Sequence, residues 1–280
     1  MLSEAYALVT AVTNALGVVL IAKGMKGSTP IVAAFYSVAV QAGVLTAIIL
    51  TRLPPMNLPA VGFFAMSGLL ALGLGRLLNF AAMRGMGVAR TSALIGSNPV
   101  LTTMLSIAIL SERPTTSTVV GAFTVAAGVA LISGAEGFRI ERAFFIGLAS
   151  ALCYSLSSIA GKAGLNIQPD PFLSAQVGAT VGLLFYVIYF TATRQFGGLR
   201  VGRLSLQCFA ATGLISSVGW LTMMKALELG AVSVVTTIVF SYPLISLIFT
   251  RLLIREEELK MRTVAGSVLV VLGVVVVILL

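Results

Sequence analysis

Three observations predict that this 280-residue chain is an all-α integral membrane protein with ten transmembrane helices, arranged as two inverted five-helix repeats. Apolar residues make up 58% of the sequence and charged residues only 10%, whereas soluble domains average about 45 to 50% apolar and about 25% charged. The apolar residues gather in runs of about 20, the length that spans the hydrocarbon core of a bilayer. A pattern of the first half also returns in the second.

The returning pattern keeps one offset of 144 residues. In both copies a Ser-x-Pro step interrupts an apolar run, and a proline inside a helix frees a carbonyl and kinks the axis. Two proline-broken helices at matching places point to the binding region of a transporter. The matched residues are Gly75, Leu77, Ala82, Val88, Ser97, Pro99 and Glu112 in the first copy, and Gly219, Leu221, Ala226, Val232, Ser241, Pro243 and Glu256 in the second.

Ten apolar runs are assigned as spans, with short connections between them. The runs cover residues 4–22, 31–51, 59–83, 89–110, 116–134, 143–162, 171–192, 205–227, 231–253 and 262–280. A polar, glycine-rich loop at residues 133–142 separates the predicted repeats, 1–134 and 143–280.

In the first repeat, the first run has no basic leader and is followed by Lys23 instead of a small-residue cleavage site. It is therefore expected to be a retained helix and not a signal peptide. Asn14 lies on its small, polar stripe, and Tyr36 and Gln41 lie in the second run. The third run holds Arg76 and Asn79, the fourth the step Ser97-Asn98-Pro99, and the fifth Gly121 and Gly128.

The second repeat restarts this order. Tyr154 lies in the sixth run, Gln176 in the seventh and Trp220 in the eighth, where the third run has Arg76. The ninth run contains Ser241-Tyr242-Pro243, and the tenth repeats the seven-residue glycine spacing with Gly266 and Gly273. Because five is odd, the second repeat enters the membrane from the opposite side, which is the architecture of alternating-access carriers with a site near the midplane.

These residues carry a resemblance to a known family. The stretch from Ala82-Met83 through Pro99 to Ser111-Glu112-Arg113, followed by Gly121 and Gly128, resembles the pattern of the EamA-like branch of the drug/metabolite transporter superfamily. The stretch from Ala226-Leu227 through Pro243 to Glu256, Gly266 and Gly273 is similar to it again. The resemblance implies a ten-helix carrier whose relatives move metabolites, amino acids and drugs. The chain departs from the pattern at Tyr36 and Ser37, near where many members place an arginine.

Charge placement singles out Arg76. It is the one basic residue deep inside a predicted span, and no acidic residue lies at a comparable depth in any span. An arginine at a helix centre costs at least about 2.5 to 3.5 kcal/mol, so it should face a cavity or a partner. Two interpretations stay open: Arg76 reaches the nearer membrane surface or a carbonyl freed at a proline, or it contacts the cargo, whose carboxylate or phosphate would suit the guanidinium fork.

The other polar residues of the spans are candidate cargo ligands, with packing or hydrogen bonding between helices as the alternative for each. Together with Arg76, they are Asn14, Tyr36, Gln41, Asn79, Asn98, Tyr154, Gln176, Trp220 and Tyr242, and Pro99 and Pro243 are the expected helix breaks.

The predicted function is that of a carrier for a small metabolite, such as an amino acid or a similar compound with an anionic group, working as an exporter or facilitator. A multidrug exporter for amphipathic compounds is the alternative, and a purely structural membrane protein fits less well. Proton antiport needs an intramembrane Asp, Glu or His, and the sequence has no histidine. No nucleophile with a base lies in the spans, so no enzyme, metal or cofactor is expected. Cys153 and Cys208 suggest no disulfide.

The excess of basic residues, a formal net charge of +9, lies in loops and is expected to contact lipid headgroups, not nucleic acid. The expected partners are cargo and the lipid bilayer of a bacterial inner membrane, with a homodimer left open. With ten spans, 4 basic residues lie on the side of the termini and 13 opposite. The positive-inside rule then places both termini outside the cytoplasm, whereas the family resemblance implies cytoplasmic termini.

Overall fold

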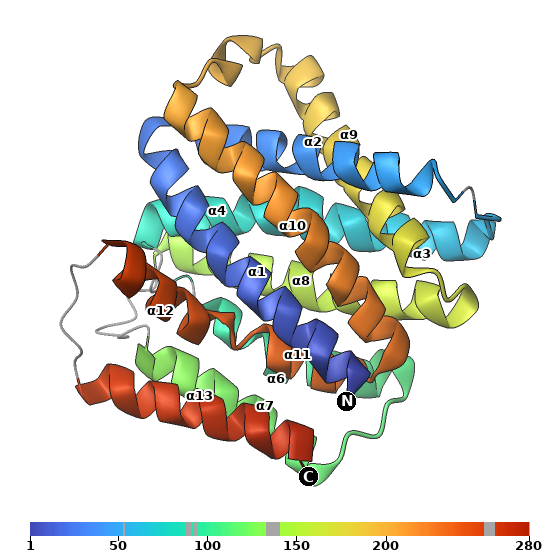
Figure 1. Ribbon diagram of the computed structural model, residues 1–280, viewed down its shortest axis with the longest axis vertical. Helices are drawn as coiled ribbons and strands as arrows, with labels where there is room; N and C mark the ends of the chain where they lie inside the picture. The colour runs from blue at the N-terminus through green and yellow to red at the C-terminus, as the bar shows by residue number, and fades with distance from the viewer. Residues whose placement is uncertain (53, 88–90, 92–93, 133–140, 255–260, 280) are drawn as a thin grey trace.

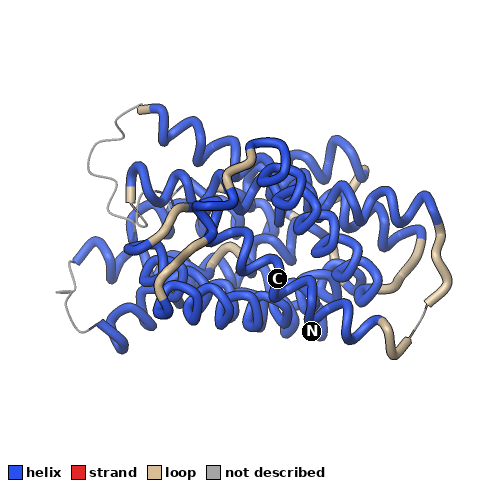
Figure 2. The backbone as a smooth tube through the Cα atoms, turned by 90° about the horizontal axis from the view of Figure 1, so that it is seen from above, coloured by secondary structure: helices blue, strands red, loops and turns tan. Residues whose placement is uncertain are grey.

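A computed structural model describes residues 1–52, 54–87, 91, 94–132, 141–254 and 261–279, and these residues form helices and no strand (Figures 1 and 2). The first half contains α1 (Leu2–Gly24), α2 (Pro30–Ile49), α3 (Leu58–Gly68), the π-helical segment η2 (Leu69–Gly75), α4 (Arg76–Met86), α6 (Asn98–Leu110) and α7 (Thr116–Ile132). The second half contains α8 (Arg142–Ile167), α9 (Pro171–Thr193), α10 (Arg203–Leu229), α11 (Val232–Val239), α12 (Tyr242–Ile254) and α13 (Met261–Leu279). Two 3₁₀ turns, Met25–Gly27 and Phe196–Leu199, lie in connections.

Six described helical stretches are long and apolar enough to cross a membrane, and four shorter ones are also apolar. The long stretches are Leu2–Gly27, Pro30–Ile49, Leu58–Met86, Arg142–Ile167, Pro171–Thr193 and Arg203–Leu229, and the shorter ones are Leu94–Leu110, Thr116–Leu131, Val232–Ser246 and Val264–Leu279. All ten overlap the predicted runs. Most of the joint at 133–142, the start of the run at 89, and the repeat residues Val88 and Glu256 lie outside the described residues.

The third run contains a feature that periodicity did not reveal. The helix from Leu58 to Met86 is continuous but changes to π geometry over Leu69–Gly75 before it resumes as α4. A π-helical turn holds an extra residue in a helix, and such turns are frequent at functional sites. Its partner in the second repeat, α10, is α-helical over its full length.

The packing of the helices is unchanged when the two repeats are exchanged. Helix α1 packs along α10, and in the same way α8 packs along the helix formed by α3, η2 and α4. Two further pairs are each formed by equivalent helices of the two repeats, α2 with α9 and α7 with α13. Figure 1 shows α1 running alongside α10, and α7 and α13 lying side by side at the lower edge of the view. The first helix of each half therefore packs on the third helix of the other half.

Small residues allow this close packing. Ala7, Ala11 and Ala15 of α1 are fully buried. A Cβ built on Gly68 would lie 2.2 Å from the backbone of Gly178, so α3 and α9 touch through their main chains. Close approach through small residues is the usual packing mode of membrane helices, which gain no hydrophobic driving force from lipid.

Candidate functional site

The two Ser-x-Pro steps are built alike, and the helical turn before each step contributes a residue to the same cavity, Ile95 in one repeat and Val239 in the other. The Ser97 hydroxyl donates to the Leu94 carbonyl at 2.6 Å, and the Ser241 hydroxyl donates to the Ile238 carbonyl at 2.7 Å. Each serine lies in a turn, and a new helix begins at the next residue, with the proline in its first turn. A proline is tolerated there because the first N–H groups of a helix have no intrahelical partner. The fourth and ninth predicted runs are thus broken helices.

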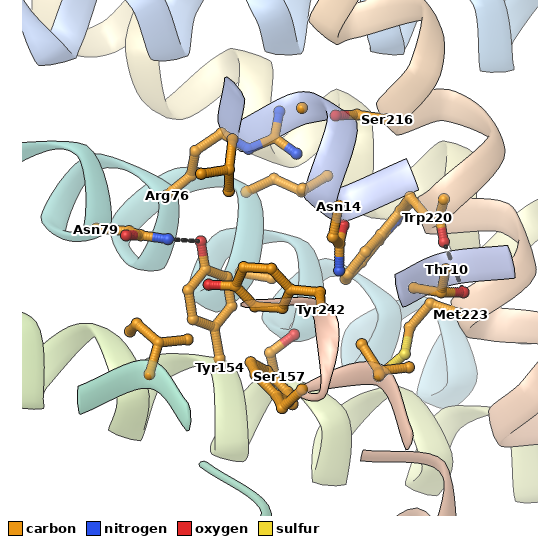
Figure 3. Close-up of a pocket in the computed structure, with 18 of the residues that line it drawn as sticks. Thr10, Asn14, Arg76, Asn79, Tyr154, Ser157, Ser216, Trp220, Met223 and Tyr242 are labelled. Carbon is orange, nitrogen blue, oxygen red and sulfur yellow. Dashed lines mark hydrogen bonds between the residues drawn. The ribbon is translucent and has the colours of Figure 1, made fainter. Parts of the chain in front are cut away.

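The cavity lies between the two repeats and holds about 910 Å³ of empty space, with open solvent at its mouth included. It is lined by α1, the α3–η2–α4 helix, α8, α10 and the segments beside both proline steps. Six predicted site residues line it: Asn14, Arg76, Asn79, Tyr154, Trp220 and Tyr242. Figure 3 shows them around one space.

The lining residues come in pairs related by the 144-residue offset. Both members of these pairs face the cavity: Thr10 and Tyr154, Asn14 and Ser158, Leu72 and Ser216, Arg76 and Trp220, Asn79 and Met223, and Ile95 and Val239. The backbone positions around the cavity are therefore symmetric, but the side chains at them are not. Where the first repeat places Arg76 and Asn79, the second places an indole and a thioether.

One wall of the cavity is polar. Arg76 points into the space, and the one hydrogen bond found for it is a long one of 3.5 Å to the hydroxyl of Ser37. Among the described residues, no acidic side chain forms an ion pair with Arg76. Nearby, the Asn79 amide donates to the Tyr154 hydroxyl at 3.5 Å. A guanidinium has five N–H donors, so Arg76 keeps most of its capacity for an anionic group.

The facing wall is aromatic and apolar. Trp220, Tyr242, Phe240 and Met223 line it. The rings of Phe240 and Tyr242 lie 6.3 Å apart, as do those of Tyr154 and Phe240. The indole N–H of Trp220 is buried and has no hydrogen-bond partner among the described residues. This wall offers aromatic ring faces and a thioether to a bound molecule.

The other four predicted ligands do not line the cavity. The Tyr36 hydroxyl donates to the Leu199 carbonyl at 2.8 Å, and the Gln176 amide donates to Thr180 at 3.1 Å within its own helix. Asn98 is fully buried and joins α6 to α8 by donating to the Ala151 carbonyl at 2.7 Å. Gln41 is also fully buried, and its amide has no partner in the described part of the chain.

Several lining residues were missed from the sequence, among them Ser157, Ser158, Thr212 and Ser216. Small hydroxyl residues are common in membrane helices, where they bond to their own backbone, so their type carries little signal. The 144-residue offset could have found Ser158, because it is the equivalent of Asn14.

A group of polar contacts lies at the end of the bundle next to the N-terminus, and those of Ser3 and Glu112 join the two repeats. The Glu112 carboxylate accepts from the Val232 N–H at 2.8 Å and from the Ser233 hydroxyl at 3.1 Å, so it caps the start of α11. The Ser3 hydroxyl donates to the Ala226 carbonyl at 2.9 Å. The Lys162 ammonium, within the second repeat, donates to the carbonyls that end α10. We call these contacts the terminal-side cluster.

The architecture and the site together define a class: a multi-pass helical membrane protein with a polar and aromatic cavity between two matching repeats, as in membrane transporters. The family model of the EamA-like transporter family matches residues 1–134 and 142–279. The chain belongs to this family, and it is therefore a membrane transporter of the drug/metabolite superfamily.

The comparison with solved structures agrees with the architecture. One structure, described only as "Crystal structure of protein", is similar to this chain with a TM-score of 0.78 at 18% identity, over 99% of this chain and 95% of that chain. This likeness shows the fold alone. No curated protein matches the chain.

Proposed function

We propose that this protein is a ten-span carrier that moves a small organic molecule with an anionic group, such as an amino acid, by alternating access. One observation carries the proposal: Arg76 lies in the central cavity with a single long hydrogen bond and no acidic partner among the described residues. A guanidinium held this way offers a bidentate site for a carboxylate or phosphate.

The inverted arrangement supports the alternating-access part of the proposal. The packing of the helices is the same when the repeats are exchanged, and both broken helices border the cavity. An odd number of spans in each repeat would place the two halves in opposite orientations, so rocking one half against the other would expose the cavity to each side in turn.

The composition of the cavity lining supports a proposal about energy coupling. No Asp, Glu or His is among the residues that line it, and such groups usually carry the protons in antiporters. We propose a facilitator or exporter driven by the cargo's own gradient, in a bacterial inner membrane.

A second candidate is a multidrug exporter for amphipathic compounds. The aromatic and apolar wall of Trp220, Phe240, Tyr242 and Met223 favours it, because ring stacking and a flexible thioether accept many shapes. The two candidates differ in their dependence on Arg76.

Transport by Arg76 variants separates the candidates. Purified protein in liposomes is given a panel of labelled amino acids, organic acids, phosphorylated metabolites and neutral or cationic amphipathic compounds. Arg76→Ala should lower uptake of the anionic cargo by at least about tenfold, because a charge-assisted hydrogen bond contributes about 1.5 to 3 kcal/mol. Arg76→Lys should restore little, since the fork is lost.

Thermal stability in detergent is measured beside transport to exclude misfolding. Full activity of Arg76→Ala with an anionic compound would contradict the proposal, and uptake of amphipathic compounds that is independent of Arg76 would favour the multidrug candidate.

A further inference from the structure

The direction in which Arg76 points depends on the π-helical segment that precedes it. An α-helix advances about 100° per residue, since it has 3.6 residues per turn. Because a π turn holds one extra residue, η2 rotates all residues that follow it by about that angle relative to an uninterrupted α-helix. Arg76 is the first residue after η2, and Asn79 follows one turn later. Both face the cavity in this register.

A residue outside the cavity holds this segment. Tyr186 of α9 is fully buried, and its hydroxyl lies 2.9 Å from the Leu72 carbonyl and 2.7 Å from the Gly73 carbonyl. The Ser150 hydroxyl of α8 donates to the Gly75 carbonyl at 2.9 Å. A widened helix leaves carbonyls poorly paired in its own ladder, and a buried carbonyl without a partner is costly. The two hydroxyls supply the donors that the π segment needs.

The second repeat provides an internal comparison. Helices α9 and α2 begin with Pro171 and Pro30, and at this offset of 141 residues the position equivalent to Tyr186 is Leu45 of α2, which has no hydroxyl. Helix α2 packs against α10 as α9 packs against η2, and α10 is α-helical throughout. Within one molecule, the π segment is present where the tyrosine is and absent where leucine replaces it.

We propose that Tyr186 is a positioning residue for cargo recognition: its hydroxyl stabilises the π geometry of Leu69–Gly75 and so aims Arg76 and Asn79 into the cavity. Tyr186 does not itself line the cavity. The inference builds on the cargo role proposed for Arg76, but its test reads only the direction of the helix and uses no cargo, so the two proposals fail separately.

The consequence of removing the hydroxyl is a defined change of register. If the segment reverts to α geometry, each later residue moves into the place of its successor. Position 76 then occupies the place of Leu77, which packs against the core, and position 78 occupies the cavity-lining place of Asn79. The proposal therefore predicts that position 76 leaves the cavity and that position 78 enters it.

The experiment measures the reaction rate of single cysteines with a small, water-soluble methanethiosulfonate reagent, in a background carrying Cys153→Ala and Cys208→Ala. Cysteine is placed at Arg76 or at Leu78. With Tyr186→Phe, the rate at position 76 should fall about tenfold and the rate at position 78 should rise by a similar factor, as expected for the loss of one buried hydrogen bond. Tyr189→Phe is the matched control, because Tyr189 lies on the same helix and its hydroxyl forms no hydrogen bond with the residues that the structure describes.

A rescue variant makes the test specific. Deleting Leu74 from the Tyr186→Phe protein removes the extra residue, so that an ordinary α-helix returns positions 76 and 78 to their original places. The original labelling pattern should return. If Tyr186→Phe does not fold, Ser150→Ala tests the same segment from α8 and should shift both rates in the same directions. Unchanged rates, rates that rise together at both positions, or no restoration by the deletion would overturn the proposal.

Discussion

At the scale of single residues, the buried polar side chains differ in whether they have partners. Asn98 donates to the Ala151 carbonyl and to the Ser155 hydroxyl, and its own carbonyl accepts from Thr102. Gln41 is equally buried, but neither atom of its amide has a partner among the described residues. A buried polar group costs free energy when it is unpaired and stabilises modestly when it is satisfied. Asn98 thus stabilises the contact of α6 with α8, whereas Gln41 has a cost that packing must offset.

This difference predicts opposite effects on stability when each of the two side chains is replaced. Asn98→Ala should lower the free energy of unfolding by about 1 to 3 kcal/mol, because it leaves buried partners unpaired. Gln41→Met keeps the length of the side chain and removes the unpaired amide, so it should stabilise by about 1 kcal/mol or more. The midpoint of thermal unfolding in detergent reports both changes.

Gln176→Met serves as the control, because the Gln176 amide bonds only within its own helix and should change stability by less than about 0.5 kcal/mol. A destabilised Gln41→Met protein would mean that the amide has a partner, such as water or cargo.

At the scale of elements, the broken helices follow from sequence-local chemistry, whereas the π segment depends on a neighbour. Each Ser-x-Pro step supplies a hydroxyl that bonds the last turn before the break and a proline suited to the first turn after it. Segment η2 carries no proline, and its carbonyls are satisfied by α8 and α9. Both kinds of irregular backbone lie at the cavity, where protein groups can replace the missing helical bonds.

The proline steps lead to a prediction about transport. Pro99→Ala or Pro243→Ala restores an N–H that can bond to the preceding turn, which should straighten the helix and favour one facing state. Since such a bond contributes about 0.5 to 1.5 kcal/mol, transport should fall about two- to tenfold with no loss of protein. Liposome uptake and expression are measured together.

Pro171→Ala is the matched control. Pro171 begins α9 after a loop, where Asp170 caps the helix and no preceding helix can be joined. Equal losses for Pro171→Ala and Pro243→Ala would indicate a general effect of losing proline. Access of a thiol reagent to Tyr242→Cys from each side of the membrane then shows which facing state Pro99→Ala favours.

At the scale of the whole molecule, the symmetry of the backbone is not matched by the side chains at every pair of equivalent positions that the structure describes. The bond from Ser3 to Ala226 corresponds, at the 144-residue offset, to the contact of Gly147 with Ala82, where no hydroxyl is present. Lys162 corresponds to Val18, which cannot donate. The contacts of Ser3 and Glu112 join the two repeats, so opening this end requires them to break. The equivalent of Glu112, Glu256, lies outside the described residues.

The cluster predicts the effect of neutralising Glu112. Glu112→Gln weakens a charge-assisted cap on α11, and such bonds contribute about 1.5 to 3 kcal/mol. The population open toward the side of the termini should rise by about tenfold or more. In sealed vesicles of known orientation, Tyr242→Cys should react faster with a membrane-impermeant thiol reagent added on that side.

Asp170→Asn is the control, because the Asp170 carboxylate also caps a helix but accepts from Phe172 and Leu173 of its own repeat. Labelling that responds equally to both substitutions, or to neither, would show that the Glu112 cap does not hold this end closed.

Much of the architecture could be read from the sequence, because its signals are local. Apolar runs of span length, the 144-residue repeat and the proline steps are properties of the chain itself. They indicated an all-helical membrane protein of two repeats, and they predicted the helix breaks at Pro99 and Pro243. Arg76 was singled out for a related reason: the cost of a charge at membrane depth needs no knowledge of the neighbouring helices.

Only the tertiary structure decided which polar side chains share the cavity. Asn79 and Asn98 look alike in the sequence, yet Asn79 lines the cavity while Asn98 joins two helices. The difference depends on the face that each helix turns to its neighbours, and that face is set by long-range packing. For the third span it also depends on one extra residue in η2, which Tyr186 holds from more than 110 positions away in the chain. The periodicity of a helix follows from its own sequence, but its rotation about its own axis depends on the helices that pack against it.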